Sequence, residues 1–264
     1  MPFPDSRNPP LRPGHVLQAL ALLSRLPVSA PTDSRGGGER QDVSDAARAA
    51  WAYPVVGLIL GALAALAGAL GLALGLPAAA AAVLVLGVQV LACGGMHEDG
   101  LADTADGLGG GWTRAQRLAI MKDSRIGTYG VLALILALAA RWVALWLLLE
   151  AGAWQAAAAI VTAAALSRAA MPILMAELPH ARDSGLAHHV GTVLRPTAWL
   201  GVAIALAAAV LLSGWAGLAA AIWAAAAVLA LALLARARLG GQTGDILGAT
   251  QQAAEVAALF SLIA

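Results

Sequence analysis

The sequence predicts an all-α fold: a polytopic integral membrane helical bundle of about six to seven transmembrane helices, with short interfacial or half-crossing helices. Of the 264 residues, 60% are hydrophobic and 12% are charged, about half the charged fraction of a typical soluble domain. Apolar stretches follow one another almost end to end. This continuity indicates one membrane-embedded domain over residues 1–264.

Charge-free runs locate the candidate spans, because about 20 apolar residues cross a bilayer as a helix. The run of residues 51–96 is broken at Pro77, where proline ends a helix. The run 196–235 is divided by Gly214. The expected spans are 51–76, 78–96, 129–149, 154–175, 197–212 and 215–235, followed by a short half-crossing at 250–264.

The connecting segments differ strongly in charge. Residues 1–50 form an expected N-terminal interfacial segment, whose apolar stretch 15–28 is too short to span and does not resemble a cleaved signal peptide. Together with 97–128, 176–196 and 236–249, it holds 14 of the 16 Lys and Arg residues. The positive-inside rule places these segments in the cytoplasm. The opposite side receives three tight turns, around Pro77 and at 150–153 and 213–217.

Composition also excludes other classes of protein. The net charge of +1 lacks the basic excess of an electrostatic nucleic-acid binder, so we expect no nucleic-acid partner. The one cysteine, Cys93, excludes a disulfide framework and a thiolate metal cage. The partner that the composition does predict is the lipid bilayer.

The segment 97–128 carries the acidic residues of an expected active-site loop. On a helix continuing from the second span, Asp99, Asp103 and Asp106 share one face at positions i, i+4 and i+7. Carboxylates on one face repel each other, and a divalent cation removes that cost. Oxygen ligands suit Mg²⁺ or Mn²⁺ rather than zinc. We interpret glycine at 100 and 107 as room for a bulky ligand. The alternative is a solvated acidic face.

Neighbouring positions add further candidates. His97 precedes the acids and is a candidate general base or ligand, although loop histidines are often neither. Glu98 lies about a quarter-turn from the aspartate face and is a candidate for substrate contact. Thr113 and Gln116 form a capping-box pattern, which predicts a short helix.

A basic cluster follows at Lys122, Asp123, Ser124 and Arg125. Two cations beside an acid and a hydroxyl suit a phosphate, with arginine as a fork and lysine as a point charge. The alternative is ordinary anchoring of a cytoplasmic loop by its positive charges.

The glycine-rich turn at 240–248 precedes another helix, and its free backbone N–H groups can meet an anion. Thr243 and Asp245 are the candidate binding residues there. For Asp245, completion of a metal site and N-capping of the helix both remain open.

Two arginines are expected at membrane depth, where charged residues usually face a cavity or a partner. Arg168 is about two turns from the cytoplasmic end of its span, and we expect it to reach a site beneath the loops. Pairing of Arg141 with Glu150 would need about two and a half turns of helix. We therefore expect another partner, or snorkelling, for Arg141.

A resemblance to a known family rests on two stretches, GGMHEDGLADTADG at 94–107 and IMKDSRIGTYG at 120–130. They strongly resemble cobalamin synthase, the adenosylcobinamide-GDP ribazoletransferase family. Shorter similarities extend over nearly the whole chain, at 24–28, 53–57, 167–168 and 243–249.

The resemblance implies a membrane enzyme that joins adenosylcobinamide-GDP to α-ribazole or its 5′-phosphate, with GMP as the second product. In the mechanism that we expect, Mg²⁺ on Asp99, Asp103 and Asp106 grips the diphosphate. A ribose hydroxyl attacks, and His97 or a carboxylate without a metal takes its proton. The residues expected to steady the phosphate oxygens are Lys122, Arg125 and Arg168.

The resemblance also implies a bacterial cytoplasmic (inner) membrane location, with the motif loops facing the cytoplasm. It leaves two kinds of protein partner open, a second copy of the chain and other enzymes of cobalamin synthesis.

Two other functions remain as alternatives. The segment from Asp103 to Gly107 is similar in its logic to the motif of CDP-alcohol phosphotransferases, but the rest of that motif is missing here. A small-solute transporter would suit intramembrane arginines and glycine-broken helices. Against a transporter, the sequence has no internal repeat, and its polar motifs gather on one side.

Overall fold

The structure, a computed structural model, describes residues 12–28 and 46–264. Most of the predicted interfacial segment 1–50 lies outside these residues. The described ranges contain helices joined by turns and loops, and the one β-type pairing among them is an isolated bridge between His180 and Gln242. The elements are α1 (Pro13–Leu23), the 3-10 helix η1 (Ala49–Ala52), α3 (Tyr53–Ala73), α4 (Ala78–Cys93), α5 (Met96–Gly110), α6 (Arg114–Ile120), α7 (Thr128–Ala151), α8 (Ala153–Glu177), α9 (Leu186–Val190), α10 (Arg195–Leu239) and α11 (Gly244–Ile263).

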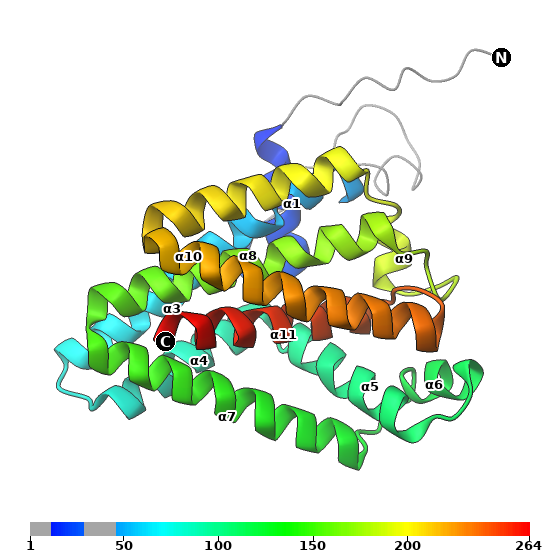
Figure 1. Cartoon of the computed structure of the whole chain (residues 1–264), viewed down its shortest axis with the longest axis horizontal. Coiled ribbons are helices and arrows are strands. Elements are labelled where there is room, and N and C mark those ends of the chain that lie inside the picture. Colours follow the sequence, from blue (N-terminus) through cyan, green and yellow to red (C-terminus); the bar gives the residue numbers. More distant parts are fainter. Residues whose placement is uncertain (1–11, 29–45) are drawn as a thin grey trace.

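The long apolar helices form a bundle that confirms the predicted membrane fold. Among the described residues, α3, α7, α8, α10 and α11 are long and apolar enough to cross a membrane, and α4 with α5 forms a sixth, bent candidate. The 45 residues of α10 are interrupted at Gly214, whose backbone is not helical. Figure 1 shows the two arms of α10 folded back on each other. These helices make the protein a multi-pass membrane protein, and the described residues hold two candidate crossings in α10 when its arms are counted separately.

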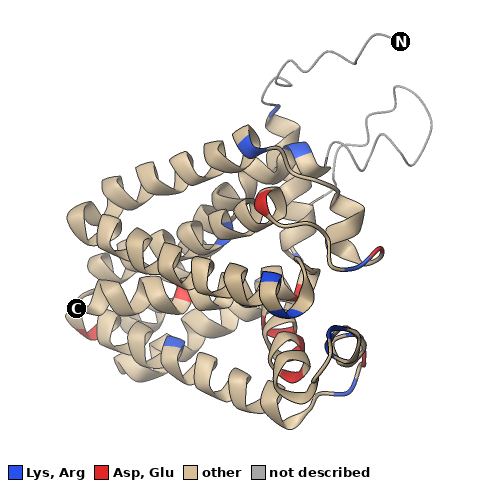
Figure 2. Cartoon of the chain, turned by 45° about the vertical axis from the view of Figure 1, so that its right-hand side comes forward, with Lys and Arg blue, Asp and Glu red and all other residues tan. Residues whose placement is uncertain are grey.

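The three predicted tight turns all lie at one end of the bundle. Each contains a glycine with positive φ: Gly75 at 85°, Gly152 at 145° and Gly214 at 56°. Side-chain-bearing residues rarely adopt these values. The opposite end of the bundle carries α5, α6 and α9, and Figure 2 shows that most charged residues gather there.

The turn at Gly214 gives a stability prediction. Gly214→Ala should destabilise the protein by about 1–3 kcal/mol, because φ 56° and ψ −133° are strained for a residue with a Cβ. The midpoint of thermal unfolding in detergent measures this effect. The matched control is Gly87→Ala, because Gly87 lies inside α4 and a Cβ there meets nothing within 4 Å. Alanine favours a helix interior, so an equal loss in both variants would contradict the strain at Gly214.

Glycine also allows close packing of the spanning helices. A Cβ on Gly61 of α3 would lie 2.9 Å from the Cα of Val161 in α8, and a Cβ on Gly57 would overlap the backbone of Ala164. Such contacts between small residues are the main source of tight helix packing in lipid. They hold α3 directly against α8.

The last helix corrects the sequence prediction. Instead of a half-crossing at 250–264, α11 begins at Gly244 and is 20 residues long. It contacts α5, α7, α8 and α10 and lies inside the bundle (Figure 1). Four polar residues lower the apolar character of this helix in the sequence, and all of them are buried: Thr250, Gln251, Gln252 and Glu255.

The acidic segment is helical, as predicted, but it does not continue the second span. The chain leaves α4 through Gly94 and Gly95, with φ of 64° and 69°, and α5 departs at 85° to α4. This turn carries α5 out of the spanning direction. The predicted capping box is confirmed: Thr113 accepts from the Gln116 N–H, and the Gln116 side chain accepts from the Thr113 N–H.

Candidate active site

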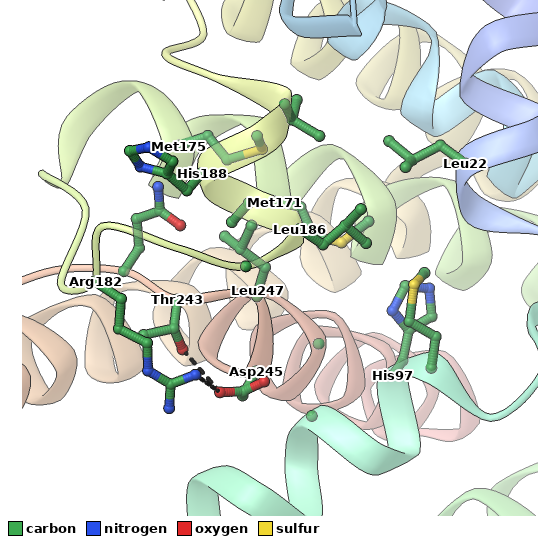
Figure 3. Close-up of a pocket in the computed structure, with 18 of the residues that line it drawn as sticks. Leu22, His97, Met171, Met175, Arg182, Leu186, His188, Thr243, Asp245 and Leu247 are labelled. Carbon is green, nitrogen blue, oxygen red and sulfur yellow. Dashed lines mark hydrogen bonds and ion pairs between the residues drawn. The ribbon is translucent and has the colours of Figure 1, made fainter. Parts of the chain in front are cut away.

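A cavity of about 180 Å³ opens at the charged end of the bundle. It is lined by residues of α1, α5, α8, α9, the start of α11 and the loop before α9. Figure 3 shows His97, Arg182, Thr243 and Asp245 on its polar sides, with methionine and leucine side chains between them. Segments far apart in the sequence therefore build a single site.

The acidic residues reach the cavity because α5 and α11 cross at two glycines. A Cβ on Gly100 would lie 2.9 Å from the carbonyl oxygen of Asp245 and 3.2 Å from the Cα of Gly248. This crossing brings Asp99 of α5 and Asp245 of α11 to the same cavity. We expected Gly100 to admit a ligand to the backbone. Instead it admits another helix, and Gly107 likewise packs against Met121.

Asp103, one turn after Asp99, interacts with both of these carboxylates. Burial, together with the charges of Asp99 and Asp245, raises the pKa of Asp103 to about 6, although Arg182 opposes the shift. Arg182 contacts Asp245 at 3.0 Å. The acid cluster formed by Asp99, Asp103 and Asp245 thus holds more negative charge than its single arginine neutralises.

Asp106 has a different position from the one that we expected. Its carboxylate accepts hydrogen bonds from the N–H groups of Gly127 at 2.7 Å and Gly130 at 2.8 Å. These are the free N–H groups at the start of α7, so Asp106 caps that helix. Of the three aspartates predicted to bind a metal, Asp99 lines the cavity with Asp245. Asp103 does not line the cavity but is near enough to both for their charges to raise its pKa, and Asp106 turns to α7.

His97 lines the cavity and is almost fully buried, with 2% exposure. Its Nε2 atom has no hydrogen-bond partner in the described structure. A buried polar atom without a partner is costly, and the residue that carries it lines the cavity. The role of His97 as a general base or a ligand stays a prediction, and its place in the cavity wall allows either role.

Glu98 and Arg141 do not face the cavity. Instead they form a buried ion pair of 2.8 Å between α5 and α7. Arg141 also contacts Glu255 of α11 at 3.3 Å and donates to Gln89 and Gln252 at 3.0 Å each. The expected contact of Glu98 with substrate is replaced by a structural role. The prediction that Arg141 has a partner other than Glu150 is confirmed.

Arg168 is also buried beneath the site rather than in it. It donates to the carbonyl oxygen of Ala164 at 3.1 Å and to the sulfur of Cys93 at 3.2 Å, and it lies 3.9 Å from Glu255. It does not line the cavity. We expected Arg168 to reach a phosphate, whereas this position gives it a role in the buried network below α5.

The predicted phosphate cluster is only partly near the cavity. Lys122 donates to Ser184 at 3.4 Å, and Ser184 lines the cavity. Arg125 is exposed and forms an ion pair of 2.6 Å with Asp123. Neither Arg125, Asp123 nor Ser124 lines the cavity.

The start of α11 is capped by Thr243, whose hydroxyl oxygen accepts from the Ile246 N–H at 3.2 Å. Asp245 is consequently free of the capping role that we had left open. Both residues line the cavity, where Thr243 also donates to Asp245 at 3.3 Å.

Comparison with known proteins now identifies the family. The model of the family described as cobalamin-5-phosphate synthase matches residues 15–263. The chain belongs to this family. A relative from Xanthobacter autotrophicus is 45% identical over 94% of this chain and 95% of its own length. A relative from Bradyrhizobium diazoefficiens is 43% identical over 92% of this chain and 90% of its own length. A relative from Mesorhizobium japonicum is 41% identical over 96% of this chain and 95% of its own length.

All three relatives are named adenosylcobinamide-GDP ribazoletransferase. No solved structure matches the chain. Membership of the cobalamin-5-phosphate synthase family makes the protein a transferase enzyme. It thereby favours the enzyme over the two alternatives, the transporter and the CDP-alcohol phosphotransferase.

The acid cluster offers oxygen ligands of the kind that a hard divalent cation prefers, but it does not form a metal site by itself. Among the described residues, no three His, Cys, Asp or Glu side chains form a complete metal-binding group. Mg²⁺, however, is commonly held by one or two carboxylates, with water and substrate phosphates as the remaining ligands. Asp99, Asp103 and Asp245 offer only oxygen atoms and carry excess negative charge, which suits that arrangement.

Sequence reasoning missed three residues of the site region. Arg182, which pairs with Asp245, has no motif around it that separates it from other loop cations. His180 accepts or donates to Gln242 at 2.9 Å, a pairing that depends on tertiary structure. Glu255 could have been found, because an acid in an apolar helix usually has a buried partner.

Proposed function

We propose that the protein transfers the adenosylcobinamide-phosphate group from adenosylcobinamide-GDP to α-ribazole or its 5′-phosphate. The products are GMP and adenosylcobalamin or its 5′-phosphate. The observation that carries this proposal is the acid cluster at the cavity, in a chain whose 41–45% identical relatives are named for this transfer.

The reaction exchanges one phosphorus–oxygen bond for another. A ribose hydroxyl of the acceptor forms a bond to the phosphorus that stays on cobinamide. The bond from that phosphorus to the GMP oxygen breaks, and GMP leaves with both electrons. His97 accepts the hydroxyl proton through Nε2, the atom that has no partner in the cavity wall.

Asp99, Asp103 and Asp245 would hold Mg²⁺, which when bound supplies positive charge that stabilises the diphosphate and the leaving GMP. The chain itself contributes further anion binding. The N-terminus of α11 borders the cavity at Gly244, and free N–H groups at a helix N-terminus favour phosphate. Lys122 lies next to the cavity through Ser184 and adds a positive charge beside the phosphates.

The cavity end of the bundle faces the cytoplasm of a bacterial cell, in the inner membrane. The supporting observation is the charge asymmetry of the sequence, because 14 of the 16 Lys and Arg residues lie in the segments that we predict to share one side of the membrane. Cytoplasmic loops carry such an excess. GDP-bearing substrates are also cytoplasmic molecules.

Removal of divalent cations tests the proposed function. With purified protein in liposomes, adenosylcobinamide-GDP and α-ribazole, we expect GMP release that stops in excess chelator and returns when Mg²⁺ is restored. Chromatography measures GMP and the corrinoid product. A CDP-lipid in place of the donor should give no CMP, and no solute should cross the membrane. Undiminished GMP release in chelator would contradict the cation, and solute flux without GMP release would contradict the enzyme.

A further inference from the structure

The cavity has an apolar side that the proposed chemistry does not use. Opposite the acid cluster, its wall is made by Leu22 of α1, Met171 and Met175 of α8, Leu186 of α9 and Leu247 of α11. Figure 3 shows Met171, Met175, Leu186 and Leu247 between His97 and His188, with Leu22 apart from them on the right. An apolar wall does not stabilise phosphates or metal ions, so this side of the cavity is suited to an apolar part of a substrate.

The size and chemistry of this side fit a flat aromatic ring. An apolar protein cavity of about 150 Å³ holds one benzene molecule, and the present cavity measures about 180 Å³. Because the 180 Å³ includes the polar side of the cavity, one aromatic ring fits inside it, the second ring of a substituted bicyclic base would lie in its opening, and a corrin ring does not fit. Methionine sulfur also makes favourable contacts with aromatic rings, and Met171 and Met175 are both buried.

One polar group on this cavity is left without a partner. Gln242 is 1% exposed and lines the cavity, and its Oε1 atom has no hydrogen bond within the described structure. Its other amide atom contacts Nδ1 of His180 at 2.9 Å. In this arrangement Nε2 donates to His180 and Oε1 is left over; with the His180 proton on Nδ1 instead, the amide can turn over, so that Oε1 accepts that proton and the N–H group faces the cavity. A single polar contact is therefore available to a mostly apolar ligand.

We propose that the apolar side of the cavity binds the aromatic base of the acceptor, α-ribazole, and that the guanine of the donor lies outside it. This inference rests on the proposed function. The base of ribazole is a methyl-substituted benzimidazole whose one free ring nitrogen is a hydrogen-bond acceptor, so it can pair with the N–H group of the Gln242 amide but not with Oε1. Guanine carries several donors and acceptors, and an apolar wall would leave them unpaired at a considerable cost.

Leu186→Ala provides the first test. Leu186 lines the cavity but is 50% exposed, so the variant should fold. We expect the Kd for α-ribazole and the KM for α-ribazole to rise about fivefold, because apolar contact with the base is lost. The KM for adenosylcobinamide-GDP should stay within about twofold of wild type. Leu194→Ala, at a 57% exposed leucine outside the cavity, is the matched control and should change neither constant.

Binding is measured by calorimetry on the purified protein with α-ribazole alone, in chelator and without the donor. Gln242→Leu is the second variant, and loss of its amide should weaken ribazole binding about tenfold. A raised KM for the donor, or GMP binding that depends on Leu186, would put guanine in the cavity and overturn the inference. Unchanged ribazole binding in both variants would also overturn it. The proposed function is tested separately by GMP release from the wild-type protein, whichever result the two variants give.

Discussion

Asp103→Asn is expected to reduce the rate of GMP release by about 100- to 1,000-fold, a loss typical of removing one strong electrostatic contact in an active site. Asp103 lies in the acid cluster between the charges of Asp99 and Asp245. Asparagine keeps the shape of the side chain and removes the charge that would hold a cation. The rate is measured at saturating substrates in liposomes, with Mg²⁺ present. A near-normal rate would contradict the role of the cluster.

Two controls separate this loss from misfolding. Glu150→Gln removes an exposed carboxylate at the opposite end of the bundle, where it contacts Trp146, and should leave the rate unchanged. The folded pKa of Asp103, about 6, exceeds its ordinary value of 3.8, so the ionised carboxylate lowers the stability of the fold at neutral pH. That cost disappears below the unfolded pKa. Asp103→Asn should therefore unfold at the same or a higher temperature than wild type near neutral pH, and the difference should shrink in acid.

Arg141→Met is expected to destabilise the protein by about 3–5 kcal/mol, the usual cost of breaking a buried ion pair from one side. Methionine fills much of the same volume, but Glu98 and Glu255 then lose the cation that lies 2.8 Å and 3.3 Å from them. The midpoint of unfolding in detergent and the rate of GMP release should both fall, because Glu98 adjoins His97 and Asp99 on α5.

A double variant distinguishes lost charge pairing from lost packing. Arg141→Met combined with Glu98→Gln removes the carboxylate that loses its arginine, whereas Glu255 keeps Arg168 at 3.9 Å, so part of the stability should return. If the double variant is no more stable than Arg141→Met alone, the ion pair with Glu98 does not account for the effect. A loss below about 1 kcal/mol in the single variant would contradict the buried network altogether.

The spans and their turns could be predicted because local sequence determines them. Charge-free runs mark the helices that lie in lipid, and Pro77 and Gly214 mark breaks that the structure retains. The capping box of Thr113 and Gln116 was predictable for the same reason, since its two partners are three residues apart. The missed span α11 shows the limit of this approach. Its buried Gln251, Gln252 and Glu255 are polar, and their partners lie on other helices.

The site was harder to predict than the fold. Helix periodicity predicts which residues share a face of a helix, but it does not predict which other element packs against that face. Asp99, Asp103 and Asp106 do share a helix, as their spacing indicates. Whether each one meets a ligand or another helix depends on what packs against it. Asp106 binds the N–H groups at the start of α7. The close contact of α5 with α11 at Gly100 places Asp245 next to α5. Neither contact leaves a local signal in the sequence.

The helix α5 is fixed to α7 at two points. Glu98 binds Arg141, and eight positions later Asp106 binds the first turn of α7. Asp99 and Asp103 lie between these two attachments. Neighbouring residues on a helix point about 100° apart, so an insertion or deletion between the attachments would break one of them and rotate Asp103 away from Asp245. Evolution can therefore vary the composition of this stretch more readily than its length.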